Sequence, residues 1–164
     1  MELNKICFCT IRICNGVQLL ASNKYKDIII RSLQFLLHKK CVRIYGFAIL
    51  PGEIQLLWEL LKTDGKEPPH LAFMRNTGEV IRQQLRREQP LLFQRIFNEP
   101  VINGGTFWQE RVGLAYVYPA SIPGILNNLH RGCGQTHYSS DRFYRDGTDV
   151  FGMLTDYRAA YYAL

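Results

Sequence analysis

The chain has 164 residues, of which 47% are apolar and 12% are aromatic. This length and composition exclude an intrinsically disordered chain and predict one globular domain over residues 1–164, with a hydrophobic core of its own. Its 20 Lys and Arg residues outnumber 14 Asp and Glu residues and give a net charge of +6. A basic protein of this kind favours polyanionic partners, although charge alone does not identify one.

Cysteine spacing and hydropathy indicate the compartment. The five cysteines form no C-x-x-C pair, and their odd number is typical of reduced thiols in a cytosolic protein. The first residues lack a basic stretch followed by a long apolar run, and no uninterrupted apolar segment reaches about 18 residues. We therefore expect a cytoplasmic protein with no membrane partner.

Hydrophobic periodicity and turn residues predict elements in the order β-α-β-β-α-β-α. Asn15-Gly16 and Pro51-Gly52 are turn signals between them. In chain order the predicted elements cover residues 5–13, 24–40, 42–50, 53–61, 70–87, 106–118 and 122–131. This order predicts an α+β fold of the ferredoxin-like kind, in which an antiparallel sheet packs against helices on one face. We expect the tail, about residues 148–164, to pack on this domain or to extend from it.

The hairpin at Pro51-Gly52 carries a polar pair on an otherwise apolar strand. Residues two apart on a strand share a face, so Glu53 and Gln55 project together while Ile54 and Leu56 point into the core. Two explanations stay open. The pair is either the solvated face of a half-buried antiparallel strand, which is the commoner case, or one part of a binding site.

The predicted helix 70–87 carries a row of arginines. Arg75, Arg82 and Arg86 follow one another at spacings of seven and four residues, and so lie on one side of the helix. Such a row can face the phosphates of a nucleic acid. It can equally be an ordinary solvated helix face, since Glu79 and Glu88 are close by.

Four separated segments carry motifs that are weak singly and more specific together. They are Leu50-Pro51-Gly52-Glu53-Ile54-Gln55, Trp108-Gln109, Asn128-Leu129-His130-Arg131-Gly132-Cys133 and Tyr138-Ser139-Ser140. In order and spacing they resemble the single-tyrosine HUH transposases, and among these the REP-associated tyrosine transposases. Members of that family have Met-Pro-Asn-His-hydrophobic-His in the hairpin, then Trp-Gln, then Tyr-Ile-His-x-Asn-Pro on a helix, then Tyr-Ser-Ser. The resemblance extends over nearly the whole chain.

The resemblance implies a chemical role for four positions. In the family, the two hairpin histidines bind a divalent metal that polarises the scissile phosphate of single-stranded DNA during transposition. A helical tyrosine attacks that phosphate, and a polar residue one turn later helps to hold the metal. In this chain the histidine positions are Glu53 and Gln55, the tyrosine position is Asn128, and the later ligand position is Gly132. The HUH motif is therefore degenerate, and all four departures fall on the chemistry.

These replacements predict a transposase-like pseudoenzyme. An amide has no ionisable nucleophile, so the covalent step has no starting group at Asn128. No cofactor is expected, although weak Mg²⁺ or Mn²⁺ binding by Glu53 and Gln55 stays open. Two alternatives also stay open: an active metal-dependent DNA nickase with a displaced tyrosine, and a domesticated protein–protein interaction module, for example a homodimer. The tyrosines nearest to Asn128 in sequence are Tyr116, Tyr118, Tyr138 and Tyr144.

Binding of single-stranded or hairpin DNA is the activity that the resemblance and the charge leave in place. The candidate contacts are Arg75, Arg82, Arg86, Arg87, Trp108, Arg111 and Arg131. The arginines would contact phosphates, while Trp108 or its neighbour Phe107 would stack on a base. Each of these side chains can equally serve the core or the solvated surface.

Overall fold

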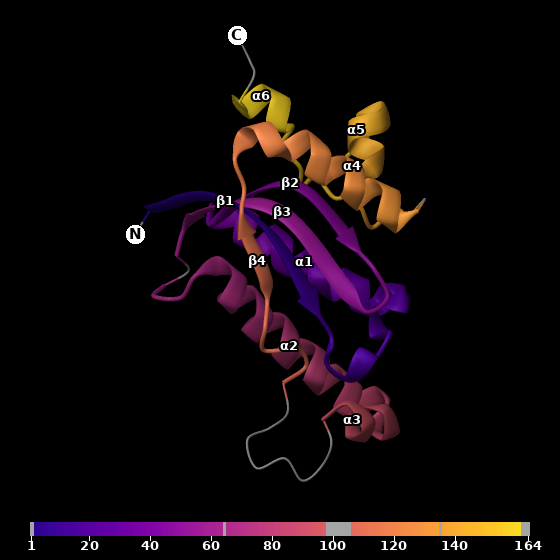
Figure 1. The fold of residues 1–164 in the computed structure, drawn as a ribbon. Helices are drawn as coiled ribbons and strands as arrows, with labels where there is room; N and C mark the ends of the chain where they lie inside the picture. The colour runs from indigo at the N-terminus through magenta and orange to yellow at the C-terminus, as the bar shows by residue number, and fades with distance from the viewer. Residues whose placement is uncertain (1, 64, 98–105, 135, 162–164) are drawn as a thin grey trace.

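A four-stranded antiparallel sheet with the order β2-β3-β1-β4 forms the centre of the computed structural model, which describes residues 2–63, 65–97, 106–134 and 136–161 (Figure 1). The strands are β1 (Glu2–Arg12), β2 (Val42–Ile49), β3 (Glu53–Lys62) and β4 (Gly113–Tyr116). β1 pairs with both β3 and β4, so β2 and β4 are the edges of the sheet. The predicted α+β fold with an antiparallel sheet packed against helices is confirmed.

Two long helices cover one face of this sheet, as predicted. They are α1 (Asn23–His38) and α2 (Pro69–Glu88), and α3 (Pro90–Phe97) follows α2 directly. Alternate residues of β3 from Ile54 to Leu60 join the core on this side. Trp58 is fully buried there, with its ring edge-on to Phe73 of α2 and its indole N–H donating to Cys9 Sγ at 3.3 Å. Truncating such a ring costs about 3–5 kcal/mol, so this layer anchors the hairpin.

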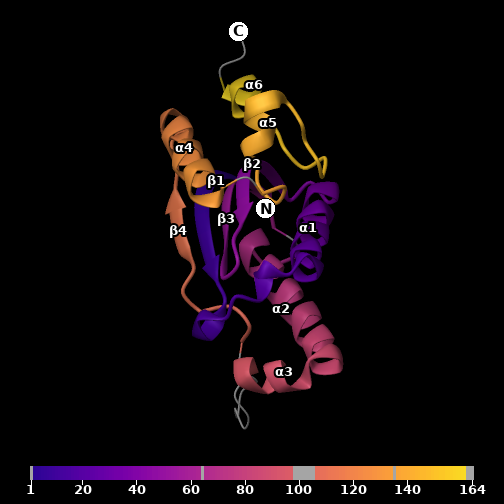
Figure 2. The ribbon, with the colours of Figure 1, turned by 90° about the vertical axis from the view of Figure 1, so that its right-hand side faces the viewer.

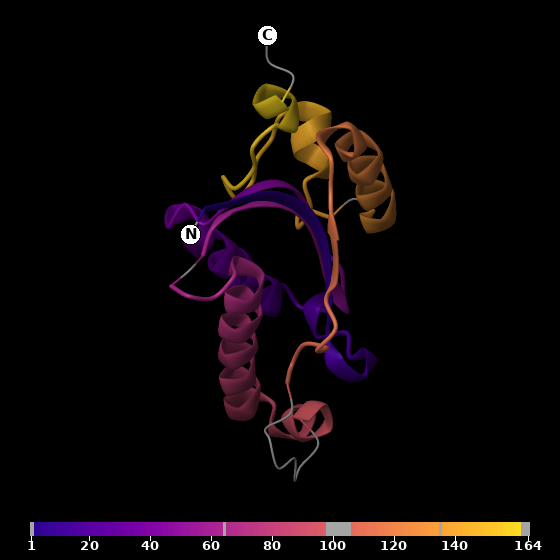
Figure 3. The ribbon, with the colours of Figure 1, turned by 60° about the vertical axis from the view of Figure 1, so that its left-hand side comes forward.

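A second helical layer packs on the opposite face. It consists of α4 (Ile122–Cys133), α5 (Asp141–Asp146) and α6 (Tyr157–Tyr161), with the sheet between it and α1 and α2 (Figures 2 and 3). A smaller core on this side joins Tyr45 and Leu57 of the sheet to Ile122 and Leu126 of α4. Helices on one face only were predicted: periodicity predicted the helix that became α4 but not the face of the sheet on which it packs, and α5 and α6 are too short to show helical periodicity.

The last strand is shorter than predicted. Of the segment 106–118, only Gly113–Tyr116 pairs with β1, opposite Cys7 to Thr10, and Trp108 makes one isolated bridge to Ile13. Phe107 and Trp108 are both buried, which draws this part of the segment into the core instead of along the sheet edge. Short 3-10 turns occur at Cys14–Gly16, Leu19–Ala21 and Pro119–Ser121.

The tail returns to β2 before it reaches α6. The Thr155 N–H donates to the Ile44 carbonyl at 2.9 Å, and Met153 is buried in the larger core. Among the helices of the described residues, none has both the length and the apolar character needed to cross a membrane.

Candidate functional site

The sheet face below α4 carries the polar pair of the hairpin. Glu53 and Gln55 alternate with buried Ile54 and Leu56, and so point to the side on which Leu57 packs against α4. In the register with β1, Arg12 stands opposite Glu53. Side chains directly opposite each other in an antiparallel pair lie on the same face, with Cβ atoms about 4.5–5.5 Å apart. Arg12, which the sequence did not single out, is thus beside the first altered metal-ligand position.

Arg12 and Glu53 form an ion pair at a cavity. The Arg12 Nε atom lies 3.3 Å from Glu53 Oε2. That oxygen is buried and accepts no hydrogen bond from the described residues, so the contact is an ion pair without hydrogen-bond geometry. Both side chains line a cavity of about 430 Å³, together with Gln18, Gly132 and the hairpin turn from Leu50 to Gly52.

This arrangement disfavours a divalent cation. The Glu53 carboxylate already has a positive charge beside it, and Gln55 adds only a neutral oxygen. In the part of the chain that the structure describes, no three His, Cys, Asp or Glu side chains are grouped so as to hold a metal ion. Weak Mg²⁺ or Mn²⁺ binding at Glu53 and Gln55 would therefore require the cation to displace the Arg12 guanidinium.

α4 brings one of its two altered positions to the same cavity. Ile122, Leu126 and Leu129 form the buried face of this helix, and Gly132 lines the cavity with Glu53. Asn128 lies one turn earlier, is exposed, and does not line the cavity. The structure thus joins Glu53 and Gly132, keeps Gln55 on the same side of the sheet, and leaves Asn128 outside.

The motif residues that the chain retains hold α4 and the tail on the sheet. His130 Nε2 lies 2.7 Å from Ser140 Oγ, which also accepts a hydrogen bond from the Phe47 N–H at 3.0 Å. The Tyr144 hydroxyl donates to the Tyr45 carbonyl at 2.6 Å. Burial lowers the pKa of His130, which favours the neutral ring in this contact. His130 and Ser140, which belong to the motif segments, therefore help to hold α4 and the tail on the sheet.

The four tyrosines considered as substitute nucleophiles fall into two pairs. The Tyr138 hydroxyl donates to Asp27 Oδ1 at 2.7 Å, and burial together with this carboxylate raises the pKa of Tyr138 to about 12. Burial also raises the pKa of Tyr144. A raised pKa disfavours the phenolate that attacks a phosphate. Tyr116 and Tyr118, by contrast, are 67% and 81% exposed and lie at the β4 edge.

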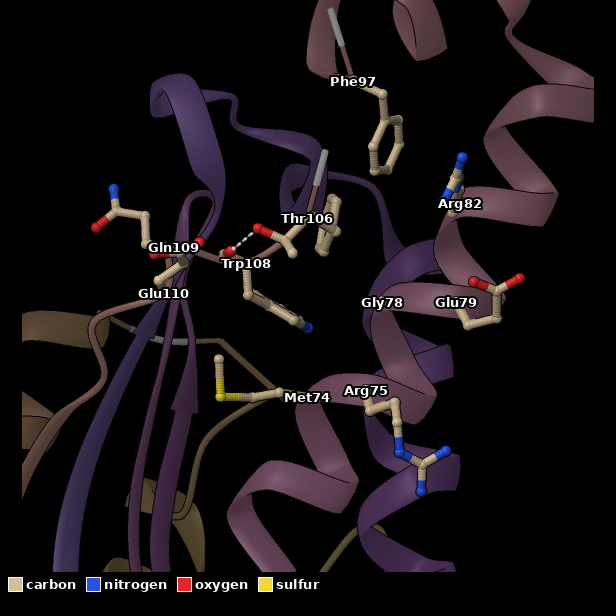
Figure 4. Close-up of a pocket in the computed structure, with 11 residues that line it drawn as sticks. Met74, Arg75, Gly78, Glu79, Arg82, Phe97, Thr106, Trp108, Gln109 and Glu110 are labelled. Atoms are coloured by element: carbon tan, nitrogen blue, oxygen red, sulfur yellow. Dashed lines mark hydrogen bonds between the residues drawn. The ribbon is translucent and has the colours of Figure 1, made fainter. Parts of the chain in front are cut away.

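Arg75 and Arg82 of α2 border a second cavity, on the opposite face of the sheet (Figure 4). It has a volume of about 350 Å³ and an apolar lining that includes Met74, Phe97 and Trp108. Arg75 donates from Nε and Nη2 to Glu67 Oε2 at 3.1 and 2.9 Å. The Arg82 guanidinium lies 5.4 Å from the centre of the Phe97 ring.

Phe107 and Trp108 belong to the core beside this cavity. Trp108 is 3% exposed, and its indole N–H donates to Thr77 Oγ1 at 3.0 Å. The two rings stand edge-on to each other with centres 4.6 Å apart. Stacking of either ring on a base would require these contacts to open. The sequence left open whether Phe107 and Trp108 stack on a base or belong to the core. Their burial places both side chains in the core.

The remaining candidate arginines lie on two separate surfaces. Arg86 and Arg87 are exposed in the last turn of α2. Arg131 is exposed next to Gly132 on α4, and exposed Arg111 follows Gln109, whose N–H donates to the Arg12 carbonyl at 2.8 Å. The seven candidates therefore do not form one patch: Arg111 and Arg131 lie toward the altered hairpin, and the others lie with α2.

Comparison with known proteins identifies the fold. No protein-family model matches the sequence, and no curated protein matches it. The solved structure of the REP-associated tyrosine transposase bound to a REP hairpin superposes with a TM-score of 0.59 at 11% sequence identity, over 96% of this chain and 90% of that chain. A candidate transposase from Deinococcus radiodurans R1 superposes with a TM-score of 0.44 at 14% identity, over 78% of this chain and 93% of that one. The chain therefore has the fold of the REP-associated tyrosine transposase, the family that its motifs resemble.

Proposed function

We propose that this protein binds single-stranded or hairpin DNA and does not cleave it by tyrosine chemistry at Asn128. The shared fold with a transposase whose structure contains a REP hairpin supports the choice of DNA. The observation that supports the loss of metal-assisted cleavage is the Arg12–Glu53 ion pair, 3.3 Å long, at the position where the resembled family has its first metal-binding histidine.

The presence of Arg12 beside Glu53 changes what the site can bind. A guanidinium attracts a phosphate through charge and directed N–H groups, as a metal ion attracts it through charge. It does not supply the polarisation that a divalent metal gives to a reacting phosphate. Arg12, whose side chain is 54% exposed, can offer its outward N–H groups to a phosphate, although the Glu53 carboxylate offsets part of its charge. With the Asn128 amide in place of a nucleophile, that position has no group that can break the ester bond.

Exposed arginines supply the remaining phosphate contacts. Arg86 and Arg87 end α2, Arg131 precedes Gly132 at the cavity with Arg12, and Arg111 lies two residues after Gln109, whose N–H donates to the Arg12 carbonyl. Phosphate contacts release counterions, so each one makes the affinity more sensitive to salt. The net charge of +6 favours association with a polyanion as a whole.

A titration with a labelled DNA hairpin and with a labelled single strand tests the binding. We expect tight binding at low salt that weakens steeply as salt is added, with a slope of about −0.7 to −0.9 per phosphate contact. No binding at low salt would refute the proposal. Sedimentation of the free protein in the same buffers measures self-association, and a stable dimer without affinity for DNA would support an interaction module instead.

A search for covalent protein–DNA adducts tests the absence of catalysis. The protein is incubated with single-stranded and hairpin DNA in the presence of Mg²⁺ or Mn²⁺, and the products are separated under denaturing conditions. We expect no adduct. An adduct that disappears in Tyr116→Phe or Tyr118→Phe would establish a nickase with a displaced tyrosine, because these are the exposed tyrosines of the four.

A further inference from the structure

The β4 edge of the sheet presents two neighbouring tyrosines to solvent. Tyr116 is 67% exposed and Tyr118 is 81% exposed. β4 is an edge strand, and the chain remains extended at Tyr118, with φ of −83° and ψ of 146°. Residues two apart in an extended chain point to the same side. The two phenol rings therefore project together from one edge.

A lysine of β1 lies next to these rings. Tyr116 stands opposite Cys7, and the Val117 N–H donates to the Ile6 carbonyl at 3.0 Å, so the two segments stay side by side toward Lys5 and Tyr118, which line the same cavity. The Lys5 Nζ atom is 5.2 Å from the centre of the Tyr116 ring. This places an ammonium group within cation–π distance of one ring and beside the other.

The rings and the lysine border a cavity of about 600 Å³. Its other lining residues are Asn4, Ile6, Val117, Pro119 and Tyr161, so none of the lining residues that the structure describes is acidic. The cavity beside α2, in contrast, has Glu79 and Glu110 together with its two arginines. The cavity at the β4 edge combines the positive charge of Lys5 with two exposed aromatic rings. Of the two cavities, it is the one that suits an anionic ligand with flat rings.

We propose that Lys5, Tyr116 and Tyr118 form a stacking site for unpaired bases of a nucleic-acid strand. The inference rests on the proposed function and adds to it the surface that receives the single-stranded part. Same-face residues of an extended chain are roughly 6.8 Å apart, about twice the ~3.4 Å that separates successive nucleotides along a stacked strand. One base can therefore insert between the rings, while Lys5 neutralises a neighbouring phosphate.

The position of the site along the chain agrees with a strand of DNA passing over it. Arg111 lies two residues before the start of β4, Tyr116 is the last residue of β4, and Tyr118 follows it by two residues. A strand that contacts Arg111 and both rings would thus follow the β4 edge. Base–aromatic stacking tolerates all four bases, so the site would hold unpaired DNA without reading its sequence.

The test compares two oligonucleotides and four protein variants at low salt. The probes are a labelled oligothymidylate and an abasic strand of the same length and charge. The test variant is Tyr116→Ala combined with Tyr118→Ala, and the matched control is Tyr116→Phe combined with Tyr118→Phe, which keeps both rings. Leu91→Ala is the control for loss of an unrelated exposed apolar side chain, because Leu91 is 77% exposed on α3.

We expect the alanine variant to bind oligothymidylate more weakly by roughly 5- to 150-fold for each stacked base that is lost. The phenylalanine and Leu91→Ala variants should bind like the unmodified protein. The unmodified protein should bind the abasic strand as weakly as the alanine variant binds oligothymidylate. Urea denaturation of each variant checks that it is folded, and Lys5→Ala provides a second variant that leaves both rings in place and should increase the dissociation constant severalfold.

Three results would overturn the inference. Equal affinity of the alanine variant and the unmodified protein for oligothymidylate would show that the rings make no contact. Equal affinity of the unmodified protein for the abasic strand would show that only phosphates are bound. If the alanine variant differs from the unmodified protein only in its sedimentation, and not in its affinity for DNA, the β4 edge is a contact with a second copy of the chain. In each case the proposed function stands if the unmodified protein binds DNA, whereas no DNA binding at low salt removes both proposals.

Discussion

Replacing Gly46 by alanine tests how closely α4 is packed on the sheet. Gly46 lies in β2, and a Cβ atom added there would be 2.4 Å from Leu126 Cδ2 and 3.2 Å from Ser140 Oγ. Carbon atoms in ordinary contact are about 3.5–4.0 Å apart. Either the Leu126 side chain or the helix that carries it must move to accommodate the methyl group.

The surroundings of Leu126 determine the size of the effect. This side chain is 4% exposed and shares its small core with Ile122, Tyr45 and Leu57, so it has little free space for another rotamer. Overpacking a core costs about 1–3 kcal/mol, while removing a glycine from a strand returns about 0.5–1 kcal/mol. We expect Gly46→Ala to lower the free energy of unfolding by about 1–2 kcal/mol.

Urea denaturation followed by tryptophan fluorescence measures this loss. Gly124→Ala is the matched control, because it lies in α4 itself and nothing lies within 4 Å of its added Cβ. It should raise the free energy of unfolding by up to about 1 kcal/mol through helix propensity. Combining Gly46→Ala with Leu126→Ala should cost less than the sum of the two single variants, because the smaller side chain at 126 removes the clash.

A stable Gly46→Ala variant would refute this packing. If its free energy of unfolding equals that of the unmodified protein, and if the double variant shows simple additivity, α4 does not approach β2 as closely as the structure places it. The placement of Gly132 in the cavity beside Glu53 would then also lose its basis, since both depend on the position of α4.

Three further outcomes follow from individual contacts. Thr77→Val removes the acceptor of the buried Trp108 N–H and should lower the free energy of unfolding by about 1–3 kcal/mol in urea denaturation; no loss would mean that the indole has another partner. Arg86→Ala and Arg87→Ala should weaken DNA binding equally for different sequences and reduce the salt slope by about 0.7–0.9 each, and an unchanged slope would exclude them as phosphate contacts. Burial lowers the pKa of His130, so the unfolded chain takes up the proton first and stability should decline as pH falls below about 6.5, the usual value. The decline should be smaller in His130→Gln, and identical pH profiles would contradict this role.

Local patterns were sufficient for most of the fold. The alternation of Glu53 and Gln55 with Ile54 and Leu56 predicted β3 and its two faces, because side-chain direction in a strand depends only on sequence parity. Helical periodicity likewise predicted α1, α2 and α4. It missed α3, α5 and α6, which have 8, 6 and 5 residues and so show hardly more than two turns of any pattern.

The candidate site depended on contacts between segments far apart in the chain. Arg12 meets Glu53 only through the register of β1 with β3, across 41 residues for which no local pattern specifies the pairing. The sequence alone does not distinguish which of the aromatic residues at positions 107, 108, 116 and 118 are buried and which are exposed. Phe107 and Trp108 are buried, whereas Tyr116 and Tyr118 are exposed on an edge strand.

The sequence by itself determined the fold class and which side chains stand at the four positions that the resemblance singles out, because periodicity and side-chain type are local properties. Only the tertiary structure decided that Arg12 lies against Glu53, that Gly132 but not Asn128 lines their cavity, and that the exposed aromatic rings are those of β4. These facts depend on strand register and on the packing of α4, which are set by the simultaneous burial of apolar side chains from distant segments.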